Sequence, residues 1–372
     1  MKYLAVLGRQ PKISLAELEA LFENVKPLGN ELAVIETTKI PDINRLGGSL
    51  KLAEELDGQP IDYLRNLPEG KITLGISDYS SHATKRSAMN EALKLKKILS
   101  RHGRSMRVVP NQTAVISTAT SHHNQLGEKT NHVELLLTNK TWWKLIGVQN
   151  ITAYAKRDQA RPARDAKVGM LPPKLAQILI NLCGDLKTGS VILDPFCGTG
   201  VVLQEAMLMG YRPYGTDISD RMVDYSIKNL GWLTTETAKH RPEKECFTVF
   251  VGDATSFKWD KFDAVACEGY LGKPMSLPPA EIKLKAEKQE CGTIILGFLK
   301  NLGKQIKSNT PVVMAAPAWL RPNGEYSRLN LLDEIEKLGY NVRKFKNASQ
   351  KDLLYHRDGQ VVARELIVLR KV

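Results

Sequence analysis

Short apolar runs alternate with stretches of helical period over the second half of the chain. Strands that alternate with helices pair in parallel, because each helix carries the chain back across the sheet. The pattern therefore predicts an α/β fold with a doubly wound parallel sheet over residues 190–372. The expected strands are 191–194, 212–216, 247–251, 264–267 and 312–315, the expected helices include 280–302 and 331–338, and a hairpin of 352–356 with 361–369 closes the chain.

The helix after the second strand is expected to begin at Ser219. Its apolar residues Val223, Ile227 and Leu230 recur at helical spacing, so they are expected to face the sheet. Gly231 is expected to end the helix, because glycine is common just beyond a helix C-terminus.

The first half of the chain predicts two smaller α+β units. Residues 3–7 and 33–37 have the pattern of strands. Between them, Ser14 and Glu17 have the spacing of a capping box at the start of a helix. This β-α-β opening predicts a ferredoxin-like domain over residues 1–62.

The second unit is expected over residues 68–156. His122 and His123 lie in its polar middle and are expected to be exposed loop side chains, because adjacent histidines do not easily share one metal ion. The expected elements are a strand at 72–76, a helix at 84–102, loops around one strand at 112–130, and a hairpin of 133–137 with 142–146.

The helix at 84–102 has one apolar and one basic face. The whole chain is basic as well, since 53 Lys and Arg against 40 Asp and Glu give a net charge of +13. Such an excess favours nucleic acid as the partner, because basic side chains neutralise phosphates, although a basic face can also be merely solvated. The positions expected to contact RNA are Lys85, Arg86, Lys94, Lys97, Arg101 and Arg104.

The cysteines and the apolar segments indicate the cellular compartment in which we expect the protein. The five cysteines are scattered, without a Cys-x-x-Cys pair, which argues against a disulfide framework or a zinc site and fits a reducing compartment. The apolar run at the N-terminus is too short for a signal peptide, and no later run is long enough to span a bilayer. We therefore expect a cytoplasmic protein with no membrane partner and no metal.

A glycine-rich turn follows the strand at 191–194. Glycines let the backbone turn sharply and admit a ligand close to the main chain, and the N–H groups at the start of the next helix attract negative charge. A dinucleotide-binding turn has a third glycine where this chain has Leu203, so a nicotinamide or flavin cofactor is disfavoured. A plain turn in another α/β protein is the alternative.

The same turn, Asp194-Pro195-Phe196-Cys197-Gly198-Thr199-Gly200, resembles the first motif of S-adenosylmethionine (SAM) methyltransferases. Nearly the whole chain is similar to the THUMP-domain tRNA guanosine-10 N2-methyltransferases. The most specific match is the junction from Lys156 to Ala176, with its run Arg164–Ala176, and the similarity also includes Leu4–Phe22 and Arg364–Leu369. The resemblance implies a ferredoxin-like domain at 1–62, a THUMP-like RNA-binding domain at 68–156, a junction and lead-in helix at 157–189, and a Rossmann-like SAM methyltransferase domain at 190–372.

The resemblance also implies the roles of the SAM-binding residues. Asp194 is expected to orient the amino end of SAM, Asp217 to accept hydrogen bonds from the ribose, and Asp253 to accept one from the adenine amine. Each of the last two aspartates has a simpler alternative, as a helix cap or a turn residue. The full expected set is Asp194, Phe196, Gly198, Thr199, Gly200, Asp217, Ile218, Asp253 and Ala254.

Catalysis is expected at the end of the fourth strand. Amino-methylating relatives have Asn, Asp or Ser there, followed by Pro-Pro and an aromatic residue, whereas this chain has Glu268-Gly269-Tyr270, one residue shorter and without prolines. Glu268 and the carbonyl of Gly269 are expected to hold the target amine, and Tyr270 to stack on the base. Cys267 is the alternative, as a nucleophile on cytosine, but the supporting residues are absent and a buried cysteine is expected.

The implied function is SAM-dependent methylation of the exocyclic N2 amine of a tRNA guanosine, on a nucleotide flipped out of its stack. The implied partner is structured tRNA, with a small accessory protein as a further possibility and the oligomeric state left open. Two alternatives stand beside this interpretation: a DNA amino-methyltransferase, and an RNA-binding protein with a non-catalytic methyltransferase-like domain.

Overall fold

The chain forms two compact units in the computed structural model, which describes residues 1–165, 170–236 and 247–372. The N-terminal unit comprises Met1–Pro11 and Phe22–Ala153, and the C-terminal unit comprises Lys12–Leu21 and Tyr154–Val372. The helix α1 (Pro11–Leu21) therefore belongs almost entirely to the C-terminal unit, although strands on both sides of it in the sequence belong to the N-terminal unit.

The N-terminal unit is built on one eight-stranded sheet with the order β2-β3-β1-β4-β8-β7-β5-β6. Antiparallel pairing of β4 with β8 continues the sheet across the boundary predicted between residues 62 and 68. The strands are β1 (Lys2–Leu7), β2 (Asn24–Leu28), β3 (Leu32–Glu36), β4 (Ser49–Glu55), β5 (Ile72–Asp78), β6 (Met106–Val108), β7 (His132–Thr138) and β8 (Thr141–Val148). The predicted hairpin at Asn139-Lys140 is present as the β7–β8 pair.

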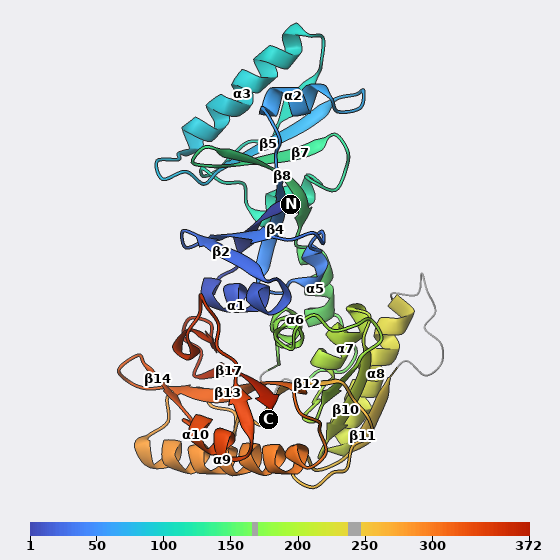
Figure 1. Cartoon of the computed structure of the whole chain (residues 1–372), viewed down its shortest axis with the longest axis vertical. Helices are drawn as coiled ribbons and strands as arrows, with labels where there is room; N and C mark the ends of the chain where they lie inside the picture. Colours follow the sequence, from blue (N-terminus) through green and yellow to red (C-terminus); the bar gives the residue numbers. More distant parts are fainter. Residues whose placement is uncertain (166–169, 237–246) are drawn as a thin grey trace. The chain divides into compact units, whose positions relative to one another are not determined.

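The helix α3 (Lys85–Arg101) packs against this sheet beside α2 (Pro60–Arg65), as Figure 1 shows. Thr84 caps it by accepting a hydrogen bond from the N–H of Ser87, which explains why it starts where the sequence predicts. Ala88, Ala92, Leu95 and Leu99 are buried, so the predicted apolar face is confirmed.

Two local predictions in the first half are wrong. The helix α1 begins at Pro11 rather than after Ser14, since proline lacks the N–H that the first turn leaves unpaired. Ser14 and Glu17 are instead buried, and Glu17 accepts a hydrogen bond from Asn181 at 2.7 Å. The stretch 112–130 contains no strand but the short helix α4 (Thr118–His123), and His122 is largely buried on it.

The C-terminal unit is built on a sheet with the order β11-β10-β9-β12-β13-β17-β15. The first five strands are parallel, as predicted, but β17 lies antiparallel between β13 and β15. The bounds are β9 (Val191–Asp194), β10 (Arg212–Asp217), β11 (Thr248–Val251), β12 (Ala264–Glu268), β13 (Pro311–Leu320), β15 (Tyr340–Val342) and β17 (Val362–Lys371), with β14 (Tyr326–Arg328) beside β13 and β16 (Leu354–Tyr355) beside β17.

Helices cover both faces of this sheet (Figure 1). Successive strand residues point to opposite faces, so Val313 packs with α6 and α7 while Met314 packs with α9. The predicted end of α8 at Gly231 is wrong, because the helix continues to Glu236, and Ile227 is 42% exposed rather than inward. The helices are α5 (Ile151–Gln159), α6 (Pro173–Leu182), α7 (Val201–Leu208), α8 (Asp220–Glu236), α9 (Glu281–Gly303) and α10 (Leu332–Lys337).

None of the helices within the described ranges combines the length and the apolar character needed to cross a membrane.

A buried ion pair lies in the core of the N-terminal unit. The ammonium of Lys51 contacts Glu134 Oε1 at 2.5 Å and donates to the carbonyl of Ile116 at 2.7 Å. Ser77 and Ser121 donate to the same carboxylate, at 2.6 Å and 2.5 Å. Removing one member leaves the other charge unpaired and away from water. This lowers the free energy of unfolding by far more than the intact pair contributes to it.

We predict that Lys51→Met lowers the free energy of unfolding of the N-terminal unit by about 3–5 kcal/mol. The free energy of unfolding is measured by urea denaturation, with hydrogen exchange of the backbone amides of β4 and β7 as the readout. Lys26→Met is the matched control, because its pair with Glu36 is exposed and is worth about 0–1 kcal/mol. Equal losses of stability in the two variants would contradict the predicted role of burial.

Candidate active site

The turn between β9 and α7 is shaped by two glycines in the left-handed region. Gly198 has φ of 50° and Gly200, which precedes α7, has φ of 81°. A Cβ on Gly200 would lie 2.9 Å from the hydroxyl oxygen of Ser226, so α8 leaves no space for a side chain there. Ser226 also donates to the carbonyl of Gly198 at 2.8 Å, and Asn229 donates to that of Thr199 at 2.9 Å. These hydrogen bonds from α8 thus stabilise the conformation of the glycine turn.

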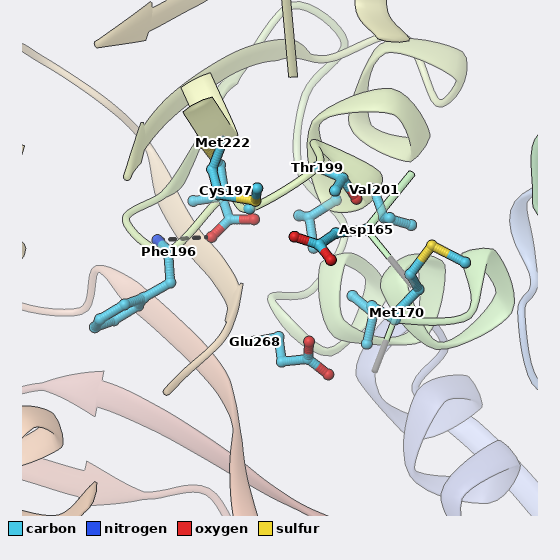
Figure 2. A pocket seen from close by; sticks show the side chains of 12 residues that line it. Asp165, Met170, Phe196, Cys197, Thr199, Val201, Met222 and Glu268 are labelled. Carbon is cyan, nitrogen blue, oxygen red and sulfur yellow. Dashed lines mark hydrogen bonds between the residues drawn. The ribbon is translucent and has the colours of Figure 1, made fainter. Parts of the chain in front are cut away.

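A hollow of about 450 Å³, including its open side, lies over this turn within the C-terminal unit (Figure 2). The predicted residues Asp194, Phe196, Gly198, Thr199 and Glu268 all line it. The full lining is Asp165, Met170, Leu171, Asp194, Phe196, Cys197, Gly198, Thr199, Val201, Val202, Met222 and Glu268.

Asp194 is a buried carboxylate at the end of β9, with 2% of its surface exposed. Its Oδ1 accepts a hydrogen bond from the N–H of Phe196 at 3.1 Å, while the Phe196 ring packs edge-on against Phe298, 5.2 Å between centroids. Burial raises the pKa of Asp194 well above its usual value. The hydrogen bond from Phe196 lowers this pKa, whereas the negative charges of Asp217 and Glu268 raise it further. A cationic group in the hollow would relieve that burial cost.

Asp217 has both carboxylate oxygens engaged with backbone. Oδ2 accepts from the N–H of Gly198 and Oδ1 from that of Ser219, both at 2.9 Å. These bonds tie the end of β10 to the glycine turn and correspond to the simpler capping role, while each oxygen keeps a second lone pair for a ribose hydroxyl. The neighbouring Ile218 is 74% exposed, which suits an apolar contact with a flat ring.

Asp253 and Ala254 follow β11, the next strand of the sheet. Oδ1 of Asp253 accepts from both the N–H and the hydroxyl of Thr255 at 2.8 Å, and Ala254 is buried. Neither residue lines the hollow, so the predicted adenine contact stays a prediction.

Glu268 ends β12 and reaches the hollow with its carboxylate (Figure 2). Its Oε1 accepts a hydrogen bond from Nε of Arg364, on β17, at 2.5 Å. Burial raises the pKa of Glu268, and the guanidinium of Arg364 opposes that rise. Arg364 is itself only 4% exposed in its side chain, so the pair is shielded from solvent.

Gly269 and Tyr270 are held away from the hollow. The N–H of Gly269 donates to the carbonyl of Ala315 at 2.9 Å, continuing the pairing of β12 with β13. The Tyr270 hydroxyl donates to Glu290 on α9 at 3.2 Å, and burial together with that carboxylate raises the pKa of Tyr270 to about 12. The structure therefore brings Glu268 to the hollow but not the aromatic ring expected beside it.

Cys267 is fully buried, as predicted, in the core under α9. Burial raises the pKa of its thiol well above its usual value, so the thiol is held in its unreactive form. Within the described ranges, no three His, Cys, Asp or Glu side chains are grouped as metal ligands.

Three of the site residues that the sequence does not predict come from the junction, and the others are Cys197, Val201, Val202 and Met222. Asp165, Met170 and Leu171 line the hollow, and Asp165 accepts from Arg221 at 2.7 Å. The sequence predicts only a junction and a lead-in helix here, yet the density of charge and proline exceeds that of a linker, which is the signal that could have found these residues. Residues 166–169 of the same segment lie outside the described residues.

Comparison with known proteins agrees with this geometry. Residues 161–267 match the family model of the RMKL-like methyltransferase domain. A protein of Methanothermobacter thermautotrophicus named tRNA (guanine(10)-N2)-dimethyltransferase is 34% identical over 166 residues, 44% of each chain. A protein of the same name from Pyrococcus abyssi is 27% identical over 300 residues, 75% of this chain and 80% of that one. The alignment thus spans less than half of the first relative.

The fold also has a solved counterpart. The crystal structure of TrmN from Thermus thermophilus matches with a TM-score of 0.50 over the full length of both chains, at 16% sequence identity. At that identity the similarity concerns the fold, and it supports the predicted Rossmann-like architecture.

We predict that Gly200→Ala weakens SAM binding and destabilises the C-terminal unit. The left-handed backbone costs about 1–2 kcal/mol for alanine, and the contact with Ser226 adds to that cost. Gly189→Ala is the matched control, because Gly189 has φ of 82° with nothing within 4 Å of its Cβ. Calorimetric titration with SAM should show wild-type affinity in the control. Equal affinity for SAM in both variants would contradict the prediction that the contact between residue 200 and Ser226 shapes the turn for binding.

We further predict that Asp194→Asn weakens SAM binding about 10- to 100-fold, since a hydrogen bond to a charged group contributes about 1.5–3 kcal/mol. In the wild type, affinity should fall as the pH drops through the raised pKa of Asp194, because the cationic amino end of SAM needs the ionised carboxylate. Asp263→Asn is the control, since Asp263 accepts from the N–H of Val191 at the other end of β9. A wild-type affinity independent of pH would contradict the assignment.

The hollow, its glycine turn and its two carboxylates all lie in or beside the segment that matches the family model. A SAM-dependent methyltransferase domain, predicted from the motif, is therefore confirmed. Residues 161–267 are thus similar to the RMKL-like methyltransferase domain, and the chain is similar in sequence to proteins named tRNA (guanine(10)-N2)-dimethyltransferase.

Proposed function

We propose that this protein transfers the methyl group of SAM to the exocyclic N2 amine of a tRNA guanosine. The observation that carries the proposal is the shared hollow, in which Asp194 and Glu268 lie at the ends of adjacent strands β9 and β12. One carboxylate suits the cationic end of the cofactor and the other suits an amine donor. The relatives' name supplies the substrate.

The residues of the turn fit SAM on their own geometry. The bare backbone at Gly198 admits a ligand close to the main chain, whereas the space beside Gly200 is filled by Ser226 of α8. Asp194 would accept a hydrogen bond from the amino group, and its buried charge would gain a partner. When bound, the cofactor supplies a methyl group on a positively charged sulfur.

Glu268 would position the target amine. Its carboxylate accepts an N–H, which aims the nitrogen lone pair at the methyl carbon. As the new N–C bond forms, the electrons of the old C–S bond stay on sulfur, and the nitrogen loses a proton. Glu268 is placed to accept that proton, since it borders the same hollow.

We also propose that the N-terminal unit binds the tRNA, with residues 68–156 as the THUMP-like part. In support, Lys85, Arg86, Lys94, Lys97 and Arg101 are exposed on α3.

Arg104 differs from the other five basic residues. Its guanidinium donates to the carbonyl of Leu67 at 2.7 Å and to that of Pro68, so it closes the loop after α2. We therefore assign the phosphate contacts to the other five residues. A cytoplasmic location remains part of the proposal, supported by the free thiols of the four described cysteines.

One observation favours a second candidate, an RNA-binding protein without catalysis. The ring expected to stack on the base is tied to Glu290 through its hydroxyl and packs with Leu284, Cys291 and Trp319. A base would need another stacking partner or a movement of Tyr270.

The proposal predicts that labelled SAM and unmodified tRNA yield N2-methylated guanosine in the presence of the protein. Mass spectrometry of the released nucleosides identifies the product and separates mono- from dimethylation. Duplex DNA with accessible amino groups serves as the competing substrate. Label in DNA but not in tRNA would overturn the substrate, and SAM binding without any transfer would favour the non-catalytic candidate.

We predict that Lys97→Gln/Arg101→Gln weakens tRNA binding and flattens its salt dependence. A basic side chain that neutralises one phosphate adds about 1 to the slope of log affinity against log salt, so removing two such side chains should lower the slope by about 2. Lys26→Gln on β2 is the control, since it removes an exposed charge from the same unit away from α3. Identical slopes in all three proteins would contradict RNA binding through α3.

A further inference from the structure

The acceptor at the end of β12 is the half-buried carboxylate of Glu268, and its partial burial disfavours the ionised form. A protonated Glu268 would carry a hydroxyl donor on one oxygen, which makes the group a weaker acceptor for an amine N–H and leaves it unable to take up the amine's proton. Burial pushes Glu268 toward that neutral form. The structure places a buried cation against it, Arg364, whose Nε lies 2.5 Å from Oε1.

The strand β17 is what brings this arginine to the site. In the sheet register Glu268 pairs with Ala315 and Arg364 pairs with Pro317, so Arg364 reaches Glu268 across β13. Its hydrogen bond uses Oε1, which leaves Oε2 as the oxygen for a further donor. The next residue, Glu365, forms an ion pair with Arg328, in which the nitrogen and oxygen atoms are 2.8 Å apart. Neither residue of this pair lines the hollow.

We propose that Arg364 is a positioning residue that keeps Glu268 an ionised hydrogen-bond acceptor for the target amine, in place of the Asn, Asp or Ser of other amino-methylating enzymes. This inference rests on the proposed function, because it assigns the acceptor role to Glu268 in that reaction. It explains how a chain without the two prolines fixes its acceptor: a salt bridge from β17 does so instead.

The first test uses Arg364→Gln, which keeps a hydrogen-bond donor but removes the charge. SAM affinity should stay within about threefold of wild type, whereas the methyl transfer rate should fall about 100-fold, as for a misplaced reacting group. The acid limb of the rate profile should move to higher pH. Among the described residues, the charged or titratable groups that contact Glu268 or share its hollow are Arg364, Asp194, Asp165 and Cys267, and only the first is changed.

A second readout does not depend on activity. Carbon-13 NMR of protein labelled at the glutamate carboxyls, with Glu268 assigned by its loss in Glu268→Gln, follows the titration of this one group. In Arg364→Gln it should titrate at higher pH than in wild type, and Arg364→Lys should restore part of the difference. An unchanged titration would overturn the inference.

A double variant tests whether Arg364 affects the transfer rate through Glu268. If Arg364 acts through Glu268, adding Arg364→Gln to Glu268→Gln should change the transfer rate less than about threefold. Arg328→Gln is the matched control, because it breaks the ion pair of the adjacent residue and also removes bonds to the carbonyls of Gln350 and Lys351. It should destabilise the fold at least as much as Arg364→Gln, yet retain the wild-type rate.

The outcomes separate the inference from the proposed function. If wild type transfers no methyl group to tRNA, the proposed function fails, while the NMR titration still reports whether Arg364 sets the charge of Glu268. If wild type is active and Arg364→Gln is equally active, or if Arg328→Gln loses as much activity, the positioning role is overturned.

Discussion

The strand β17 enters the C-terminal sheet antiparallel, between two strands that precede it in the sequence, and much of the unit depends on that insertion. It pairs with β13 over nine residues, from Val362 to Arg370. Leu366 and Val368 pack with α6, while Ile367 and Leu369 pack with α9, so one strand contributes to the cores on both faces. The same strand sets Arg364 against Glu268, which lines the hollow, so the pairing of the sheet is linked to the charge of the site.

Charge and burial act against each other throughout the hollow. Asp194 is a buried carboxylate and Glu268 a half-buried one, so burial disfavours the ionised form of each, and the charge of Glu268 adds to the cost for Asp194. Arg364 offsets this for Glu268 within the protein itself. Among the described residues, Asp194 has only a backbone N–H in that role, so a cationic ligand would complete what the fold leaves uncompensated. This asymmetry is the physical basis for the different partners that we propose for the two carboxylates.

Part of the fold was predictable because its physical causes are local. The periodicity of α3, the hairpin turn at Asn139 and the parallel strands β9 to β13 follow from side chains within a few residues of each other. The capping box at Ser14 and the helix end at Gly231 were wrong for the opposite reason. Ser14 and Glu17 are buried by α1's packing in the C-terminal unit, and α8 continues through its glycine against the turn and core. Tertiary contacts outweighed local preference in both places.

The amino-acid sequence by itself determined the glycine turn, the acidic residues at the strand ends and the basic face of α3, because each depends on residue type and short spacing. Only the tertiary structure decided what those residues meet. It brought the junction residues Asp165 and Met170 over the turn, turned Tyr270 toward α9 and set Arg364 against Glu268. These contacts join segments up to about a hundred residues apart, and the register of an antiparallel strand cannot be read from periodicity alone.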